Sequence, residues 1–308
     1  MRTLRDSLVD YLTMRRALGY KLRRHQKLLA QFADYLDGIE AARITVENAV
    51  AWARLPTNGS VTWWASRLSI ARGFAIYLHT LDPAHQVPPA DVLPYRSHRA
   101  TPYLYSDQDI RALITAADTL RFPLRAATYK TLIGLLAVTG MRIGEAISLD
   151  CDDLDLGQSV LVVRTGKFGK SRELPLHATT MQSLRTYLHH RGHLRPTPST
   201  SALFVSPAGT RLLYCDVNWT FLKLVDLAGL RSRSASCRPR LHDLRHSFAV
   251  HTLLDWYHAG VDVQPRLPLL STYLGHVNPG ATYWYLSAAP DLMILASNRL
   301  EKGLGRRP

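Results

Sequence analysis

The stretch LGHVNPGATYWYL, residues 274–286, places a tyrosine nine residues after a histidine. Taken alone, that spacing says little. Three segments nearer the N-terminus carry basic residues that could act with this tyrosine. They are LHDLRHSF at 241–248, TGKFGKSRELPL at 165–176 and TGMRIGE at 139–145. In chain order, the four segments supply an arginine, a lysine, a histidine, a second arginine, a second histidine and a tyrosine. The four segments are therefore predicted to form one site.

The net positive charge of the chain indicates what kind of molecule it binds. Its 308 residues include 38 Lys and Arg against 24 Asp and Glu, a formal net charge of +14. Such an excess favours a polyanion, either nucleic acid or an anionic membrane surface. Hydrophobic residues make up 46% of the chain, enough for a packed core. The length suits one large domain or two ordinary ones.

Cysteine usage and the apolar runs favour a cytoplasmic protein without a metal. Cys151, Cys215 and Cys237 lie far apart and form no CxxC pair, so neither a zinc site nor a disulfide framework is predicted. The N-terminal MRTLRDSLVDYL carries charges inside its apolar stretch, unlike a signal peptide. The longest apolar run, around 131–141, is too short to span a bilayer. We expect no membrane association and no cofactor.

The two arginines can bind a phosphate. Attack on a phosphodiester builds negative charge on the non-bridging oxygens, and without a metal fixed guanidinium groups must stabilise it. Arg142 and Arg245 come from different elements and could hold one phosphate from two sides. Glu145, one turn after Arg142, is predicted to orient that arginine. Either arginine alone would be better explained as an ordinary ion pair on a helix.

A lysine can supply the proton that the leaving group needs. A DNA 5′-oxygen leaves poorly as an alkoxide and requires protonation. Lys167, at the tip of a glycine-bearing hairpin, is the predicted donor. Lys170 is the competing residue, and a nonspecific contact with backbone phosphates explains it better.

The histidines divide into two groups. His242 and His276 are candidates for hydrogen bonds to the phosphate or for handling the tyrosine proton. His246 and His251 follow on the same helix as His242, and we expect them to pack or cap. The His242 and His246 pair has metal-like i, i+4 spacing, but no Glu follows His242 directly as a zinc protease motif requires. We therefore predict no metal.

The stretch offers two tyrosines for the nucleophile. A tyrosine hydroxyl is weakly nucleophilic at neutral pH and needs positive neighbours or a base. Tyr283 and Tyr285 are two residues apart, so on a helix they point to different sides. Only one of them can face the phosphate, and the other is expected to be an aromatic core contact.

The remaining sequence indicates a mainly helical chain. Residues 1–80 read as four helices, with breaks at Gly19 and at Asp37–Gly38 and with Thr45 as an N-cap. The 82–102 stretch holds five prolines and is interpreted as an extended linker. Beyond it we expect mostly helix, beginning with a capping box at Ser106 and Asp109. Two strands at 160–164 and 172–176 form the hairpin.

Together these motifs resemble the tyrosine recombinase, or phage integrase, family. TGMRIGE resembles the motif of the first catalytic arginine and the hairpin resembles the lysine motif. LHDLRHSF resembles the His-x-x-Arg motif, and LGH precedes the nucleophile at the interval that selects Tyr285. The implied catalytic set is Arg142, Lys167, His242, Arg245, His276 and Tyr285, with Glu145 in support.

The resemblance also implies an architecture and an activity. It implies an N-terminal helical, SAM-like core-binding domain at 1–82, a proline-rich linker at 83–102 and a DNA breaking-rejoining catalytic domain at 103–308. The sheet of the catalytic domain should be small and antiparallel. The implied reaction is site-specific cleavage and rejoining of double-stranded DNA through a 3′-phosphotyrosine, in a homotetramer on synapsed sites. The resemblance further implies that the DNA is that of a mobile element. An accessory recombinase or a DNA-bending protein is a further expected partner.

Two other functions share part of this pattern. A type IB topoisomerase uses the same phosphotyrosine chemistry but relaxes supercoils without a second site. A non-catalytic relative would bind DNA as an accessory factor. The segment between Arg245 and His276 is longer and richer in proline than the family resemblance leads us to expect, and residues 290–301 could form a C-terminal helix that docks on a neighbouring protomer.

Overall fold

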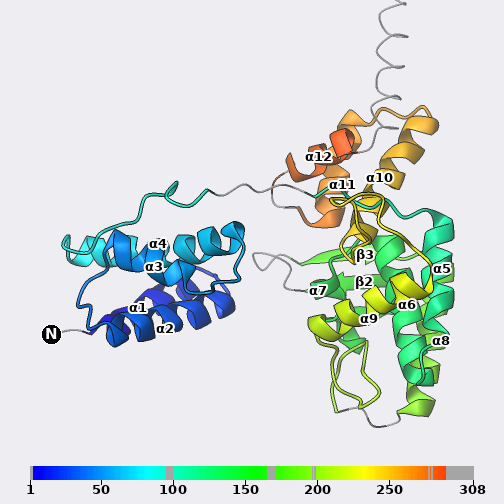
Figure 1. Ribbon diagram of the computed structural model, residues 1–308. Helices are drawn as coiled ribbons and strands as arrows, with labels where there is room; N and C mark the ends of the chain where they lie inside the picture. The colour runs from blue at the N-terminus through cyan, green and yellow to red at the C-terminus, as the bar shows by residue number, and fades with distance from the viewer. Residues whose placement is uncertain are drawn as a thin grey trace, which may run out of the picture. The chain divides into compact units, whose positions relative to one another are not determined.

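The computed structural model describes residues 3–94, 100–164, 171–195, 197, 199–276, 278 and 280–288. The chain divides into two compact units, Met1–Arg99 and Ala100–Pro308 (Figure 1). Helices dominate both units, and the sheet has three strands. The mainly α fold with a small antiparallel sheet that the sequence predicted is thus confirmed. None of the helices in the described ranges is long and apolar enough to cross a membrane.

The first unit is built from four helices. They are α1 (Leu4–Ala17), α2 (Arg23–Gly38), α3 (Val46–Arg54) and α4 (Val61–Leu81). Thr45 caps α3, because its side chain accepts a hydrogen bond from the Asn48 amide, as predicted. Phe32 and Trp52 pack at the centre with ring centroids 4.7 Å apart. A single apolar core therefore holds the four helices together.

Part of the predicted linker packs on this first unit. The Ile44 amide donates to Nδ1 of buried His85 at 3.1 Å, and the Gln86 amide donates to the Ile44 carbonyl at 2.8 Å. Leu93 is 3% exposed and belongs to the same core. The prolines of this stretch keep it out of a helix, but its first half is held in place by tertiary contacts. The domain boundaries themselves stay a prediction.

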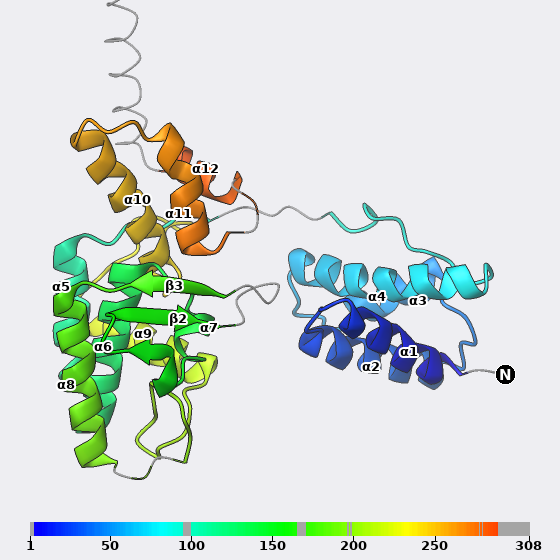
Figure 2. The same ribbon diagram turned by 180° about the vertical axis from the view of Figure 1, so that it is seen from behind.

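The second unit joins eight helices of its described part to the sheet. Its helices are α5 (Asp107–Ala117), α6 (Pro123–Thr139), α7 (Ile143–Ala146), α8 (Ala178–Leu194), α9 (Tyr214–Leu227), α10 (Asp243–His258), α11 (Leu267–Leu274) and α12 (Gly280–Ala288). Two short 3₁₀ turns, Cys151–Asp153 and Gln264–Arg266, lie between them. Figure 2 shows α10, α11 and α12 gathered at one end, next to the outer strand of the sheet.

The sheet is a meander with strand order β1-β2-β3. Its strands are β1 (Leu154–Asp155), β2 (Val160–Val163) and β3 (Arg172–Pro175), paired antiparallel throughout. Val163 pairs with Arg172, so the hairpin turn falls between these two residues. The two hairpin strands are confirmed. The two-residue β1 was not predicted, because a strand this short leaves no alternating pattern.

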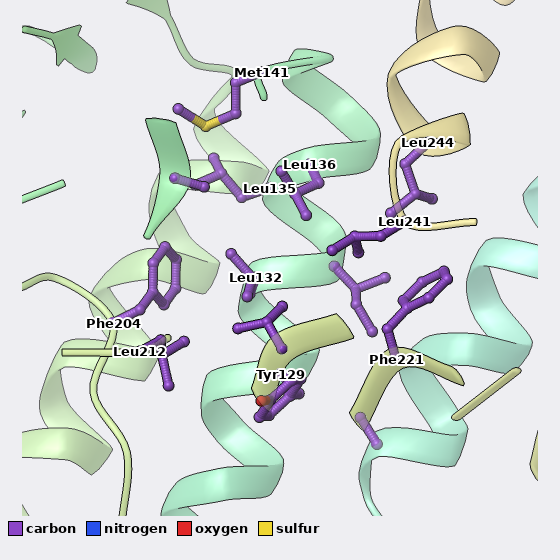
Figure 3. Close-up of a cluster of buried hydrophobic side chains, with 14 of the residues drawn as sticks. Tyr129, Leu132, Leu135, Leu136, Met141, Phe204, Leu212, Phe221, Leu241 and Leu244 are labelled. Carbon is purple, nitrogen blue, oxygen red and sulfur yellow. The ribbon is translucent and has the colours of Figure 1, made fainter. Parts of the chain in front are cut away.

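Helix α6 is the central element of the second unit. It contacts α5, α8 and α10, and its apolar side chains meet those of the other elements in one core (Figure 3). The residues labelled there are Tyr129, Leu132, Leu135, Leu136, Met141, Phe204, Leu212, Phe221, Leu241 and Leu244. Gly140 ends α6 in the left-handed conformation at φ +58°, and a Cβ there would lie 2.4 Å from the Phe248 ring. This stop turns the chain toward Arg142 and α7.

Candidate active site

Arg142 is fixed at the start of α7 by Glu145. The Glu145 carboxylate accepts a hydrogen bond from the Arg142 amide at 2.9 Å and another from Nη1 at 2.9 Å. One carboxylate oxygen, Oε2, thus caps the helix, and the other, Oε1, holds the guanidinium. The side chain of Arg142 stays 28% exposed, whereas that of Glu145 is 9% exposed. Glu145 therefore fixes the Arg142 guanidinium on its protein side, while part of the arginine side chain stays accessible to solvent.

A second arginine donates hydrogen bonds to the same carboxylate. Arg172, on β3, donates from Nη2 to one Glu145 oxygen at 2.8 Å and from Nη1 to the other at 3.2 Å. Its Nε donates to the Tyr273 carbonyl at 2.8 Å. Burial opposes ionisation of Glu145, but the hydrogen bonds from Arg172 and Arg142 outweigh it and lower the Glu145 pKa below its ordinary value. The carboxylate is ionised at neutral pH and joins β3 to α7.

Gly275 makes room for this arrangement. Its φ is +68°, and a Cβ at this position would lie 2.8 Å from Nη1 of Arg172. A side chain here would carry the strain of a left-handed backbone and would displace the guanidinium. The glycine that ends α11 is therefore required by a contact with the sheet as well as by the helix cap.

Arg245 is a buried cation on α10. It is 2% exposed and donates from Nη1 to the Gly140 carbonyl at 2.8 Å and from Nη2 to the Leu274 carbonyl at 2.7 Å. Burial, and then the nearby charge of Arg142, lower its pKa to about 10, which leaves it protonated at neutral pH. Within the described ranges no carboxylate forms an ion pair with it. A buried charge of this kind favours an anion as ligand.

The two predicted arginines converge on the end of α11. Arg142 Nη2 donates to the Gly275 carbonyl at 3.0 Å, directly beside the Leu274 carbonyl that Arg245 holds. Consecutive carbonyls thus bring together guanidinium groups that are 103 residues apart in the sequence. His276 follows immediately, and its Nδ1 shares a 2.7 Å hydrogen bond with the Thr282 hydroxyl.

Both predicted histidines lie in the positive field of the arginines. Burial, then Arg245 and Arg142, lower the His276 pKa to about 4. His242 lies just before α10 and is exposed to solvent on one side. Desolvation by the surrounding protein, and then the charges of Arg245 and Arg142, nevertheless lower its pKa to about 4. Both imidazoles are therefore neutral at neutral pH, and each can donate through one ring nitrogen and accept through the other.

The two tyrosines of α12 differ sharply in exposure. Tyr285 is 2% exposed, and its ring stacks on His276 with a centroid distance of 6.1 Å and an interplanar angle of 23°. Its hydroxyl lies 3.2 Å from Nδ1 of His246. Tyr283 is 46% exposed. The two tyrosines differ in their surroundings, but the core contact that we predicted for the second tyrosine is wrong for Tyr283, because its side chain is exposed.

The structure brings most of the predicted site together. Arg142, Glu145, His242, Arg245, His276 and Tyr285 are linked by shared contacts or by the electrostatic effects described above. Lys167 and Lys170 fall in 165–170, outside the described residues, as do residues 290–301. No three His, Cys, Asp or Glu side chains of the described ranges gather into a potential metal site.

Sequence reasoning missed two members of this site. Arg172 was read only as part of a strand, yet it anchors Glu145. His246 was expected to pack or cap, whereas its ring lies 4.8 Å from that of His242 and its Nδ1 contacts the Tyr285 hydroxyl. The i, i+4 spacing from His242 places His246 one helical turn away on the same side of α10, which is the signal that could have identified it.

Comparison with known proteins identifies the family. The Phage integrase family profile matches residues 103–291. The chain is 45% identical over 308 residues to the y4rB protein of Sinorhizobium fredii, covering 98% of each chain. It is 31% identical over 218 residues to the tyrosine recombinase XerC of Alcanivorax borkumensis, covering 71% of this chain and 66% of the relative. The chain belongs to the phage integrase family: it is a tyrosine recombinase, an enzyme of site-specific DNA recombination.

Solved structures share the fold. The Tn1549 transposon integrase in complex with transposon right-end DNA superposes with a TM-score of 0.65 at 17% identity, covering 96% of this chain and 98% of the other. A lambda integrase tetramer bound to a Holliday junction gives a TM-score of 0.58 at 18% identity, covering 92% of this chain and 77% of the other. Of the three functions that the sequence left open, family membership supports the recombinase.

Proposed function

We propose that Tyr285 is the nucleophile of this recombinase. Its oxygen attacks the phosphorus of a DNA phosphodiester, the new P–O bond forms a 3′-phosphotyrosine, and the bond to the 5′-oxygen breaks. Because the bond energy is kept in the phosphotyrosine, a second 5′-hydroxyl can reverse the step and rejoin the strand without ATP. The burial of Tyr285 beside His276, against the exposure of Tyr283, supports this choice of tyrosine.

Arg142 and Arg245 bind the scissile phosphate in this proposal. Their anchoring at consecutive carbonyls is the single observation that carries it, because two forks fixed side by side suit the non-bridging oxygens of one phosphate. Arg172 and Glu145 hold Arg142 in place. Neutral His242 and His276 add hydrogen bonds to the phosphate. Lys167 protonates the departing 5′-oxygen.

The wider assembly is proposed from the relatives. We place DNA binding also on residues 1–82 and assign the cleaving unit to residues 103–308. Four copies act on two synapsed sites, as the tetramer of lambda integrase on its junction suggests. The transposon integrase of similar fold supports action on a mobile element. An accessory DNA-bending protein or a second recombinase is a further proposed partner, and we place the reaction in the cytoplasm.

The test is covalent capture on a nicked suicide duplex. The duplex is built from the DNA that flanks the gene, and the product is an SDS-resistant protein–DNA adduct. Wild type, Tyr283→Phe and Tyr285→Phe are compared, each with a gel-shift control for binding. Loss of the adduct in Tyr285→Phe alone is expected. Loss in Tyr283→Phe alone would move the nucleophile by two residues and overturn the assignment.

A further inference from the structure

Two histidines lie side by side near the C-terminal end of α8. His189 and His193 are one helical turn apart and both exposed, and their ring centroids are 4.3 Å apart at an interplanar angle of 41°. This end of α8 lies at the opposite end of the second unit from α10, α11 and α12 (Figure 2). The pair is therefore separate from the candidate active site, none of whose residues lies on α8.

A backbone hydrogen bond fixes the tautomer of His193. Its Nδ1 lies 3.1 Å from the His189 carbonyl oxygen. A carbonyl oxygen only accepts, so Nδ1 carries the proton, and in the neutral ring Nε2 keeps its lone pair. Metal-binding histidines carry this kind of bond, which orients the ring and leaves the other nitrogen as the ligand. No described residue hydrogen-bonds to a ring nitrogen of His189, so its imidazole is available as well.

We propose that His189 and His193 together bind one divalent transition-metal ion, such as Zn²⁺. Residues i and i+4 lie on one face of a helix, so two imidazoles at this spacing can coordinate the same ion. Imidazole suits Zn²⁺, Ni²⁺ and Cu²⁺, whereas Mg²⁺ and Ca²⁺ prefer oxygen ligands. In the described part of the chain no third His, Cys, Asp or Glu joins the pair, so water fills the other positions. This site is independent of the proposed function.

The charges around the pair are compatible with a bound cation. Arg191 is 6% exposed and donates from Nη1 to the Cys151 sulfur at 2.7 Å, and Arg195 donates from Nη2 to the Ala208 carbonyl at 2.6 Å. Both neighbouring guanidinium groups are thus held by other partners. The partial negative charge at the C-terminal end of a helix also favours a cation there.

A second histidine pair of the same spacing is a poorer metal site. His242 and His246 are also four residues apart, with ring centroids 4.8 Å apart. However, Nδ1 of His246 is already in contact with the Tyr285 hydroxyl, and the charges of Arg245 and Arg142 act on His242. A positive field that suits a phosphate opposes a metal cation, so the ion is expected on α8 and not on α10.

Calorimetric titration of the untagged, EDTA-treated full chain with ZnCl₂ tests the site. His189→Gln and His193→Gln each remove one ligand and keep a polar side chain. His190→Gln changes the neighbouring exposed histidine of α8 and is the matched control. MgCl₂ is the control ion. Thermal unfolding with and without ZnCl₂ measures the stabilisation that binding to the folded state produces.

We expect wild type and His190→Gln to bind one Zn²⁺ per chain and to unfold at a higher temperature with ZnCl₂, with neither effect in MgCl₂. His189→Gln and His193→Gln should each lose the saturable binding and the thermal shift, while their unfolding temperatures without metal stay those of wild type. Absence of binding in wild type, binding that persists in either of these two variants, or its loss in His190→Gln alone would overturn the inference.

Discussion

Arg172 Nη2 lies 2.8 Å from a Glu145 oxygen, and the same carboxylate holds Arg142 at 2.9 Å. A strand residue thereby positions an arginine of the proposed phosphate site through a carboxylate whose side chain is only 9% exposed. The arrangement explains why α7, a helix of one turn, can present Arg142 in a fixed direction. It also makes the site depend on the packing of β3 against the end of α11.

Arg172→Ala should destabilise the protein and slow cleavage together. Removing one partner leaves the Glu145 charge buried with fewer hydrogen bonds, which costs about 3 kcal/mol in the free energy of unfolding. Urea unfolding measures the stability, and adduct formation measures the rate. Lys130→Ala breaks an exposed pair with Asp118 in the same unit and should cost less than about 1 kcal/mol. Equal effects of the two substitutions would contradict the special role of Arg172.

Gly275→Ala tests the close approach at the end of α11. The positive φ and the 2.8 Å contact with Arg172 predict a loss of about 1–2 kcal/mol in stability, together with slower cleavage. Gly144→Ala is the control, since a Cβ there meets nothing within 4 Å and its φ is not positive. Because alanine favours a helix over glycine, that variant should be neutral or slightly stabilised. Thermal unfolding of both variants measures the change in stability, and equal stability of the two would contradict the close approach at Gly275.

Arg142→Ala and Arg245→Ala should each reduce the rate of adduct formation by about 10²-fold or more, because each removes one fork from the developing charge. Arg245→Lys should also be impaired. The planar guanidinium contacts two carbonyls and can still face a phosphate, whereas a compact ammonium group cannot reach all three. Single-turnover cleavage at saturating enzyme isolates the chemical step. A rate close to wild type in either alanine variant would remove that arginine from the proposed site.

The stability of the protein should fall on mild acidification. The folded-state pKa of His276, about 4, lies below its ordinary value of 6.5. The unfolded chain therefore binds more protons between these two values, so the free energy of unfolding is greatest above pH 6.5 and decreases as the pH falls toward 4. His276→Gln should make this slope shallower, by roughly 1 kcal/mol per pH unit. Urea unfolding across this pH range is the measurement, with His193→Gln on the exposed surface of α8 as control. An unchanged slope in His276→Gln would contradict the assigned shift.

Local features of the sequence predicted the elements well. The Thr45 cap and the Ser106–Asp109 capping box formed as expected, because their bonds join residues three apart. The hairpin strands were visible as β-branched and apolar runs on either side of glycines. The two-residue β1 was not visible, since its identity as a strand comes only from pairing with β2.

The sequence by itself determined the helical class, the family and the order of the six proposed catalytic residues, because each of these is written in short motifs and their succession. Only the tertiary structure decided which side chains touch. Arg172 reaches Glu145 across 27 positions and His246 reaches Tyr285 across 39. The i, i+4 spacing from His242 marks the side of α10 on which His246 lies, but the sequence does not show what either side chain touches, because both contacts depend on how β3, α7, α10 and α12 pack around the end of α11. The physical reason is that hydrogen-bond direction and burial are set by the fold, whereas motif spacing fixes only residue type and order.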